Sequence, residues 1–251
     1  MHSAFFACFE IINVTINIYP GRWVHIKISI IMPVLNEAQN LRNTLGRLRL
    51  SENEELIIVD GGSTDETMSI AREFTDKVFE TRTGRASVMN CGAQKAEGEV
   101  LLFLHADCIL PDNGFHIIRK HIHDRTIAAG AFLLRIAHPG FGFRIIESAA
   151  NMRSRLTSLL YGDQGMFLRN DVFSRIGGFA DIPLMEDIEI SGRLKKEGKI
   201  VFINPPIQAS PRRWIREGLL YTTVRDWYIA CLYTFFKIPP EKLIRHYREV
   251  R

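Results

Sequence analysis

The sequence predicts an α/β fold in which helices cover both faces of a central, largely parallel sheet. Short runs of apolar and β-branched residues alternate along the chain with segments of helical periodicity, which is typical of parallel strands joined by helices. Two early runs, 28–35 and 56–59, stop abruptly at polar or turn-forming residues. Parallel strands that are buried on both faces end in this way where the sheet opens into a crevice.

Strands and helices are expected to alternate along the rest of the chain. A Rossmann dehydrogenase or a methyltransferase would show the same alternation, but both need a glycine-rich turn after the first strand. The turn here, Pro33 to Glu37, contains no glycine, which argues against both classes. The expected strands are 28–35, 56–60, 77–81, 100–104, 128–136, 164–168 and 200–204. The expected helices are 64–74, 84–96, 111–123, 141–160, 185–196 and 218–238.

Length and composition are those of one enzyme-sized domain. The 251 residues include 46% hydrophobic and 24% charged residues, enough to bury a full core. Four cysteines are scattered without a CxxC pair or zinc-like spacing, which indicates a reduced, cytoplasmic setting. The net charge of +4 comes from 212–251, which holds nine Lys and Arg against four Asp and Glu. No basic–aromatic recognition module is visible, so we expect no nucleic-acid partner. The basic segment suits a diphosphate or an anionic membrane surface.

Polar residues gather where the first two strands end. Asn36 and Glu37 follow the first strand, and Asp60 and Asp65 follow the second, so all four are expected at the ligand-binding edge of the sheet. Acidic side chains there suit ribose hydroxyls, base N–H groups or a metal ion.

The segment after Asp60 also predicts a tight turn and a helix start. Gly61 and Gly62 allow the backbone to turn sharply and to approach a ligand. The segment 63–66 reads as a capping box, with Ser63 as the cap and Glu66 three residues later. A strand followed by Asp-Gly-Gly is also common as a purely structural turn, so both interpretations stay open.

A strand ending in PVLNE, followed by one ending in VDGGSTD, resembles the start of family 2 glycosyltransferases of the GT-A fold. The resemblance continues to about Trp214, because further motifs occur in the family's order. It looks closest to the small bacterial subgroup described as radical-SAM/selenodomain-associated family 2 transferases. The resemblance places the ends of the first two strands against the nucleotide sugar, through Pro33, Asn36, Glu37, Asp60 and Gly62.

The fourth expected strand ends at His105-Ala106-Asp107. The family normally has Asp-x-Asp here and uses the final Asp to hold Mg²⁺ or Mn²⁺ on the donor diphosphate, so the resemblance assigns the metal to Asp107. One carboxylate, two phosphate oxygens and water form an adequate ligand set for Mg²⁺. His105 replaces the family's first Asp, and it is either a second ligand favouring Mn²⁺, a nucleotide contact or a structural hydrogen-bonding residue.

The segment 184–189, LMEDIE, resembles the family's Glu-Asp motif at the start of a helix. An acceptor hydroxyl must lose its proton as it attacks the anomeric carbon, and a carboxylate within reach can act as general base. The resemblance gives that role to Asp187, with Glu186 in support. An acidic first turn is also favoured by the helix dipole alone.

Five further residues are expected near the donor or the acceptor. Asp163 and Gln164 lie in a Gly-Asp-Gln stretch similar to one in the subgroup, which otherwise is turn chemistry. Arg85 follows Gly84 at a helix start, a position suited to binding an anion. Processive members carry Gln-x-x-Arg-Trp before the C-terminal segment, whereas here three residues separate Gln208 from Arg212. This difference argues against long-polymer synthesis and leaves Arg212 or Arg213 to neutralise the diphosphate, unless these arginines face lipid or solvent.

The expected domain boundaries follow from the resemblance. Residues 1–27 form an extension, 28–211 the GT-A catalytic domain and 212–251 a basic, aromatic helical segment. The extension lacks the basic start of a signal peptide. It is expected to be an extra strand, a disordered arm or an over-long gene start. The clean apolar run 227–236 is too short to span a bilayer. The C-terminal helix is expected either to lie on a membrane surface or to pack on the catalytic domain or a dimer partner.

The resemblance implies an inverting enzyme that moves one sugar from a nucleotide-diphosphate sugar, expected to be UDP-linked, to a hydroxyl acceptor with the help of Mg²⁺ or Mn²⁺. The acceptor is either lipid-linked or of another kind. The expected location is the cytoplasm or the cytoplasmic face of the membrane. Two other classes stay open: a nucleotidyltransferase, which would release pyrophosphate, and a non-catalytic nucleotide-sugar-binding subunit, which the altered His105 position favours.

Overall fold

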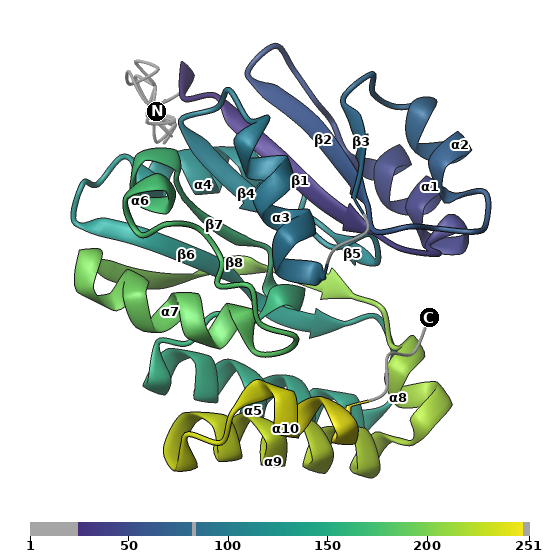
Figure 1. The fold of residues 1–251 in the computed structure, drawn as a ribbon, viewed down its shortest axis with the longest axis vertical. Helices are drawn as coiled ribbons and strands as arrows, with labels where there is room; N and C mark the ends of the chain where they lie inside the picture. Colours follow the sequence, from purple (N-terminus) through teal and green to yellow (C-terminus); the bar gives the residue numbers. More distant parts are fainter. Residues whose placement is uncertain (1–24, 82–83, 248–251) are drawn as a thin grey trace, which may run out of the picture.

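The computed structural model describes residues 25–81 and 84–247, and these form one mixed sheet covered by helices (Figure 1). The strand order across the eight-stranded sheet is β3-β2-β1-β4-β7-β6-β8-β5. The strands are β1 (Ile28–Val34), β2 (Glu54–Asp60), β3 (Val78–Glu80), β4 (Val100–Phe103), β5 (Cys108–Ile109), β6 (Ile127–Ile136), β7 (Met166–Arg169) and β8 (Lys199–Ala209).

Parallel pairing dominates the half of the sheet that is built from the N-terminal strands β1 to β4. β1 pairs in parallel with β2 and β4, and β2 pairs in parallel with β3. β7 then runs antiparallel to both β4 and β6, and β5 runs antiparallel to β8, while β6 and β8 are parallel. The predicted α/β fold with a mixed, mostly parallel sheet is confirmed. The carboxyl ends of β1, β2 and β4 therefore meet at one edge.

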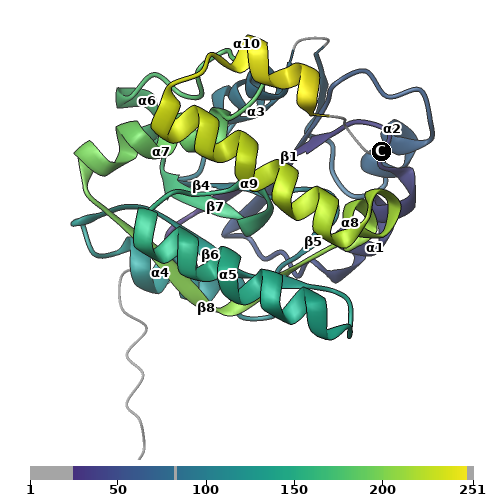
Figure 2. The same cartoon turned by 90° about the horizontal axis from the view of Figure 1, so that it is seen from below.

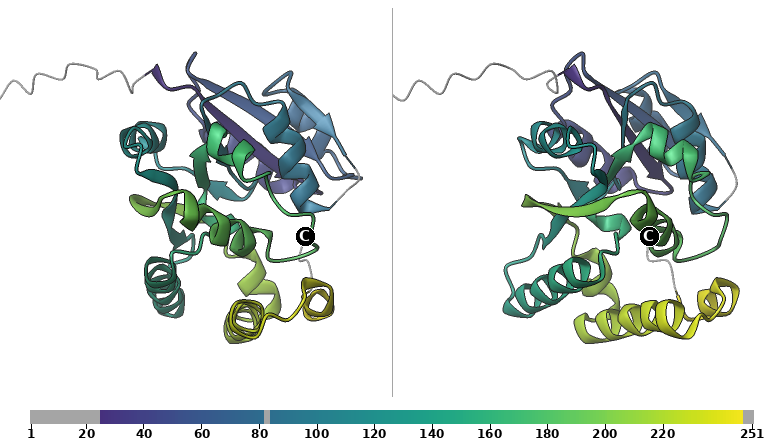
Figure 3. Two further views of the ribbon diagram at one scale, coloured as in Figure 1. Left: turned by 60° about the vertical axis from the view of Figure 1, so that its left-hand side comes forward. Right: turned by 90° about the vertical axis from the view of Figure 1, so that its left-hand side faces the viewer.

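Helices cover both faces of the sheet, as predicted (Figures 1 and 3). One face is covered by α1 (Ala38–Arg47), α2 (Thr67–Arg72), α4 (Gly114–Ile122) and α5 (Phe141–Thr157). The other face is covered by α3 (Arg85–Gln94), α6 (Asn170–Arg175) and α7 (Glu186–Glu197). Burial on both faces explains why the strands read as continuous apolar runs rather than as alternating ones.

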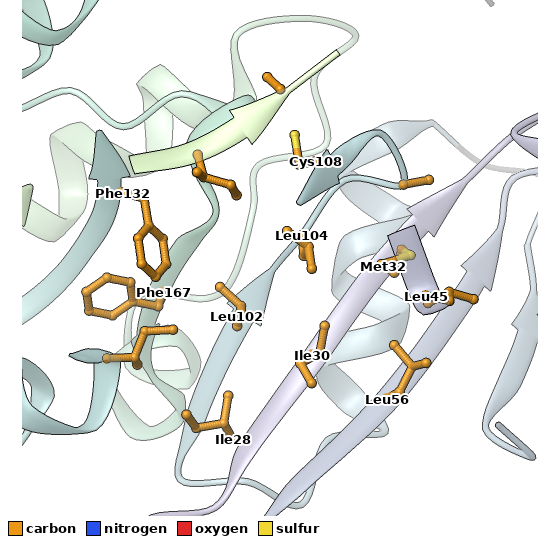
Figure 4. Packing of buried hydrophobic residues seen from close by; sticks show 14 of the residues in the cluster. Ile28, Ile30, Met32, Leu45, Leu56, Leu102, Leu104, Cys108, Phe132 and Phe167 are labelled. Atoms are coloured by element: carbon orange, nitrogen blue, oxygen red, sulfur yellow. The ribbon is translucent and has the colours of Figure 1, made fainter. Parts of the chain in front are cut away.

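The side chains of β1 and β4 show this two-sided burial directly. Ile28, Ile30 and Met32 of β1 point to the α1/α4 side, where Leu102 of β4 joins them (Figure 4). Ile31 packs on the opposite face with α3. Farther along the same core, the Phe132 and Phe167 rings meet edge to face with centroids 6.3 Å apart. This core fixes the strand ends on which the site is built.

Three local predictions were wrong or incomplete. Ser63 is not a helix cap, because α2 begins at Thr67 and its N-cap residue makes no capping bond. The Ser63 hydroxyl instead donates to Asp60 and accepts the N–H of Asn36 at 2.8 Å. The expected helix 141–160 ends at Thr157 because Ser158 adopts the left-handed conformation, with φ of 50°. The expected strand 164–168 begins at Met166, after a 3₁₀ helix η2 (Gly162–Gln164). The elements α1, α6 and β5 were not anticipated.

The C-terminal segment folds back along the molecule as α8 (Arg212–Glu217), α9 (Leu219–Phe236), α10 (Pro240–Leu243) and a 3₁₀ helix η3 (Ile244–His246). α9 lies beside α5 below the sheet (Figures 2 and 3). It buries Ile229 and Ala230 against Leu184, Leu159 and Ile188. Packing against the rest of the chain was one of the two alternatives expected for this helix, and these contacts show it. Within the described part of the chain, no helix combines the length and apolarity needed to cross a bilayer. The expected extension 1–27 lies almost wholly outside the described residues.

Candidate active site

A cleft of about 890 Å³ opens at the carboxyl ends of β1, β2 and β4. One side, which we call the sheet wall, consists of Pro33, Glu37, Arg85, His105, Asp107 and Arg212. The other side, which we call the helical wall, is contributed by α5 and α9 and consists of Ile146, Ala150, Arg153, Thr223, Asp226, Trp227, Ile229 and Ala230. Of the site residues predicted from the sequence, the following line this cleft: Pro33, Glu37, Arg85, His105, Asp107, Asp163, Gln164, Glu186, Asp187, Arg212 and Arg213.

Three predicted donor contacts, Asn36, Asp60 and Gly62, lie outside the cleft lining and build the turn behind it. Asp60 is only 2% exposed, and its Oδ2 accepts the N–H groups of Gly62 and Ser63, each at 2.8 Å. Gly62 has φ of +103°, a conformation that side chains rarely adopt. The Asn36 side chain accepts the N–H of Thr64 at 2.9 Å. Their polar atoms are therefore used in shaping the turn that positions the strand ends.

Arg212 joins two carboxylates of the sheet wall. Its Nη1 donates to Glu37 Oε2 at 2.8 Å, and its Nη2 pairs with both Glu37 and Asp107, lying 3.5 Å from the Asp107 Oδ2. Burial raises the pKa of Asp107, and Glu37 and Asp163 raise it further, while Arg212 opposes the rise. A concentrated negative charge thus faces the cleft, balanced by one arginine.

Asp107 fits a hard divalent cation better than its neighbours do. The ligand atoms of His105, Asp107 and Cys108 all lie within 4.8 Å of one another. However, His105 Nε2 faces Arg85 Nη2 at 2.6 Å, and since arginine only donates, this nitrogen is used as an acceptor. Burial raises the pKa of the Cys108 thiol well above its ordinary value, so the thiolate is disfavoured. Oxygen donors are what Mg²⁺ and Mn²⁺ prefer, and Asp107 supplies one beside Glu37.

His105 is neutral in this arrangement. Burial lowers the pKa of its ring well below the usual value, and the Arg85 and Arg212 charges lower it further. The close packing of this pair depends on Gly162, where an added Cβ would lie 2.6 Å from Arg85 Nη2 and 2.9 Å from His105 Cε1. Of the interpretations open for His105, the structure shows the hydrogen-bonding one.

Glu186 and Asp187 begin α7, but their surroundings differ. Glu186 is 3% exposed and pairs with Arg85, whose Nε lies 3.2 Å from its Oε1. Asp187 accepts the Gly162 N–H at 3.0 Å through Oδ2 and the Ile188 N–H at 2.8 Å through Oδ1. Burial, and then the adjacent Glu186 carboxylate, raise the pKa of Asp187 to about 7, although Arg85 and these N–H groups oppose the rise. A carboxylate with this pKa is able to accept a proton near neutral pH.

The two residues of the Gly-Asp-Gln stretch differ in exposure. Gln164 is 1% exposed, and its Oε1 accepts the Ser154 hydroxyl at 3.3 Å. Asp163 lines the cleft, and burial raises its pKa while Arg153 and Arg213 oppose the rise. Gln164 therefore tethers η2 to α5, and Asp163 contributes charge to the cleft.

Arg213 is tied to the C-terminal segment. It pairs with Asp226 of α9 and donates to the Tyr247 hydroxyl at 2.8 Å, and its guanidinium lies 5.2 Å from the centre of the Tyr247 ring. The neighbouring Arg212 faces the opposite way, toward Glu37. The two adjacent arginines of α8 therefore link the end of β1 to the C-terminal helices.

Sequence reasoning missed Arg153, Tyr161 and Tyr247 as cleft residues and treated Trp227 only as a surface aromatic. Arg153 had a detectable signal, because it follows Ile146 and Ala150 at helical spacing and so shares a face of α5 with them. Tyr161 and Tyr247 had none, since their positions depend on how distant segments pack.

Comparison with known proteins agrees with this architecture. PcManGT, a mannosyltransferase from Pyrobaculum calidifontis in complex with GDP-Man and Mn²⁺, is 19% identical with a TM-score of 0.63, over 89% of this chain and 66% of that one. S. aureus TarS 1–349 is 18% identical with a TM-score of 0.59, over 88% of this chain and 69% of that one. The fold is therefore that of GT-A glycosyltransferases.

Sequence relatives match over a shorter stretch. The glycosyltransferase AglE of Haloferax volcanii is 32% identical over 92 residues, which is 32% of this chain and 30% of AglE. A PGL/p-HBAD biosynthesis glycosyltransferase of Mycobacterium tuberculosis is 42% identical over 88 residues, 32% of this chain and 34% of the relative. The match thus spans about a third of each relative's length. The family model described as glycosyl transferase family 2 matches residues 29–180, more than half of the chain, and the chain belongs to that family.

Proposed function

We propose that this chain is an inverting glycosyltransferase that moves a single sugar from a UDP-linked donor to a hydroxyl acceptor. The observation that carries the proposal is that two carboxylates in different environments, Asp107 and Asp187, face one cleft. One lies beside an arginine on the sheet wall, and the other has its pKa raised to about 7. The complexes of TarS with UDP and UDP-GlcNAc, and of PcManGT with GDP-Man and Mn²⁺, support a nucleotide-sugar donor.

On the donor side, Asp107 would hold Mg²⁺ or Mn²⁺. When bound, the ion supplies positive charge against the departing diphosphate. Arg212 and Arg85 add positive charge at the same wall. Pro33 and Glu37 contact the nucleotide in this proposal, and the turn formed by Asn36, Asp60 and Gly62 holds them in place.

On the acceptor side, Asp187 takes the proton of the attacking hydroxyl at a carboxylate oxygen. The hydroxyl oxygen then displaces the diphosphate from the anomeric carbon in one step, which inverts the configuration. Glu186 does not act on the substrate but holds Arg85 beside the base. Asp163 and Gln164 lie at the same end of the cleft and position the sugar or the acceptor.

The test is turnover of a panel of UDP- and GDP-sugars with Mg²⁺ or Mn²⁺, with the products identified. The expected result is release of the nucleoside diphosphate and a product of inverted anomeric configuration. D107A is expected to abolish turnover, whereas D181N, at an exposed acid outside the cleft lining, retains it. Release of pyrophosphate would instead identify a nucleotidyltransferase. Donor binding without any turnover would identify a binding subunit.

We further propose that the face formed by α5, α8, α9 and η3 contacts a membrane surface and that the acceptor is presented there. Nearly all of the large exposed apolar side chains of the described residues lie on these elements. Leu220 and Phe235 of α9 are 77% and 73% exposed, and Leu156 of α5 is 78% exposed. Arg155 and Lys237 are exposed on the same elements and suit anionic lipid.

A further inference from the structure

Arg153 differs from the other arginines that line the cleft. Among the residues that the structure describes, no carboxylate oxygen lies within ion-pairing distance of its guanidinium. Its buried Nε, like that of Arg213, has no hydrogen-bond partner. A buried N–H group without an acceptor costs free energy, so it favours any ligand that supplies one. The other three are each paired with a carboxylate: Arg85 with Glu186, Arg212 with Glu37 and Arg213 with Asp226.

Two aromatic rings hold Arg153 in place. Its guanidinium carbon lies 3.9 Å from the centre of the Tyr161 ring and 5.2 Å from the centre of the Trp227 ring. Stacking of this kind stabilises the cation and restrains the planar fork while its N–H edges stay available for an anion. Because α5 supplies the arginine and α9 supplies the tryptophan, the arrangement exists only where these helices lie side by side (Figure 2).

The position of Arg153 connects it to the acceptor rather than to the donor. Tyr161 precedes Gly162, whose N–H donates to Asp187 at 3.0 Å, so the Arg153–Tyr161 stack adjoins the proposed base. The rest of the lining from α5 and α9 is mostly apolar, and its polar side chains are Thr223 and Asp226, of which Asp226 is paired with Arg213. Arg212, which is expected to face the diphosphate, lies beside Glu37 and Asp107 at the sheet end of the cleft, whereas Arg85 reaches Glu186 next to the proposed base.

We propose that Arg153 binds a phosphate or carboxylate group carried by the acceptor, close to the hydroxyl that Asp187 deprotonates. The inference deepens the proposed function and rests on it, because the chain has an acceptor only if it is a glycosyltransferase. The planar fork matches two oxygens of either group. The apolar lining indicates that the body of this acceptor is apolar, so the ligand is an anionic amphiphile.

The test is calorimetric titration of the full chain with octyl phosphate below its micelle concentration, with octanoate and 1-octanol as the carboxylate and neutral probes. R153Q is expected to bind octyl phosphate about tenfold more weakly than the wild type, because a charge-assisted hydrogen bond is lost. The octanol affinity stays unchanged. R47Q, at an exposed arginine of α1 outside the cleft lining, serves as the control and binds like the wild type.

Titration with UDP and Mn²⁺ separates this inference from the proposed function. R153Q is expected to keep its UDP affinity within about twofold, as independent sites do. A matching loss of UDP affinity would put Arg153 in the donor site and overturn the inference. So would equal octyl phosphate affinity in R153Q and the wild type, or no binding to the wild type. If the wild type binds octyl phosphate through Arg153 but does not bind UDP, only the proposed function fails.

A second variant covers the case in which R153Q does not fold. R153K keeps the charge but loses the planar fork, so we expect octyl phosphate to bind more weakly than to the wild type. Unchanged affinity in R153K would then contradict a fork-specific contact.

Discussion

The two walls of the cleft hold their charged groups in different ways. On the sheet wall, Arg85 is paired with Glu186, and Arg212 with Glu37 and Asp107. On the helical wall, Arg153 contacts two aromatic rings and has no carboxylate within ion-pairing distance among the described residues, although its charge lowers the pKa of Asp163. A wall whose charges are already paired is preorganised for a ligand of fixed charge, such as a metal diphosphate. A wall with an unpaired cation among apolar groups suits a ligand that brings its own anion.

The surfaces behind the two walls also differ. The turns behind the sheet wall satisfy their polar groups through internal hydrogen bonds, such as those that Asp60 accepts. The helices behind the helical wall expose apolar side chains such as Leu156 and Phe235. In the proposed function, the donor approaches from water and the acceptor from an apolar environment, and this difference is consistent with that proposal.

The largest effect that would test this division is expected for D187N. Loss of the proposed base should lower kcat by about a thousandfold, within the range known for general bases. Because Asp187 is not part of the sheet wall, UDP affinity in the presence of Mn²⁺ should change by less than about twofold. Single-turnover kinetics and calorimetry measure the two quantities. Nearly normal kcat in D187N would remove Asp187 from the mechanism.

The pH dependence should follow the ionisation of Asp187, whose pKa is raised to about 7. Only the carboxylate accepts a proton, so kcat/KM is expected to fall about tenfold per pH unit below this value. A raised pKa in the folded protein also means that stability is lost as pH rises from the unfolded value toward 7. D187N has no ionisable group at this position and does not lose stability in this way. The melting temperature of D187N minus that of the wild type should therefore increase from pH 5 to pH 8. If kcat/KM does not change with pH and the difference in melting temperature stays constant, Asp187 is not the base.

The apolar outer face should govern membrane binding. Replacing Leu220 and Phe235 by serine should weaken co-sedimentation with anionic phosphatidylglycerol vesicles by about tenfold or more, because two large side chains no longer insert. Hydrolysis of the nucleotide sugar in water should stay unchanged. The control is L50S, which alters an exposed leucine outside this face. Equal loss in both variants would show that the face has no special role.

The smallest effect on chemistry is expected at Asp60. D60N should lower the free energy of unfolding by about 1–3 kcal/mol, because the buried side chain accepts two backbone N–H groups and a hydroxyl. UDP affinity should change little if Asp60 only shapes the turn. Urea denaturation and calorimetry separate these outcomes. Near-normal stability with a large loss of UDP affinity would restore Asp60 to direct nucleoside contact, as the sequence predicted.

The sheet wall could be predicted from sequence because each signal for it lies within one short segment of the chain. Strands 28–34 and 54–60 are buried on both faces, so their apolar runs and their polar ends stand out. The capping box at Ser63 failed because the nearby Asp60 carboxylate binds the same hydroxyl. The two-residue strand β5 is too short to leave a pattern.

The helical wall could not be predicted in the same way. The contact of Arg153 with Trp227 joins residues that are far apart in sequence and depends on the docking of α9 beside α5. Residue spacing alone does not show where a C-terminal helix will pack. The family was correctly identified from the motifs, whereas the bacterial subgroup stays a prediction.

The most direct test of the account is the effect of Mn²⁺ on UDP affinity in the wild type and in D107A. We expect Mn²⁺ to tighten UDP binding to the wild type by about tenfold or more, because Asp107 would hold the ion and the ion would supply positive charge against the diphosphate. In D107A this gain should disappear while the melting profile stays cooperative. A gain of equal size in D107A, or no effect of Mn²⁺ on the wild type, would contradict the central claim.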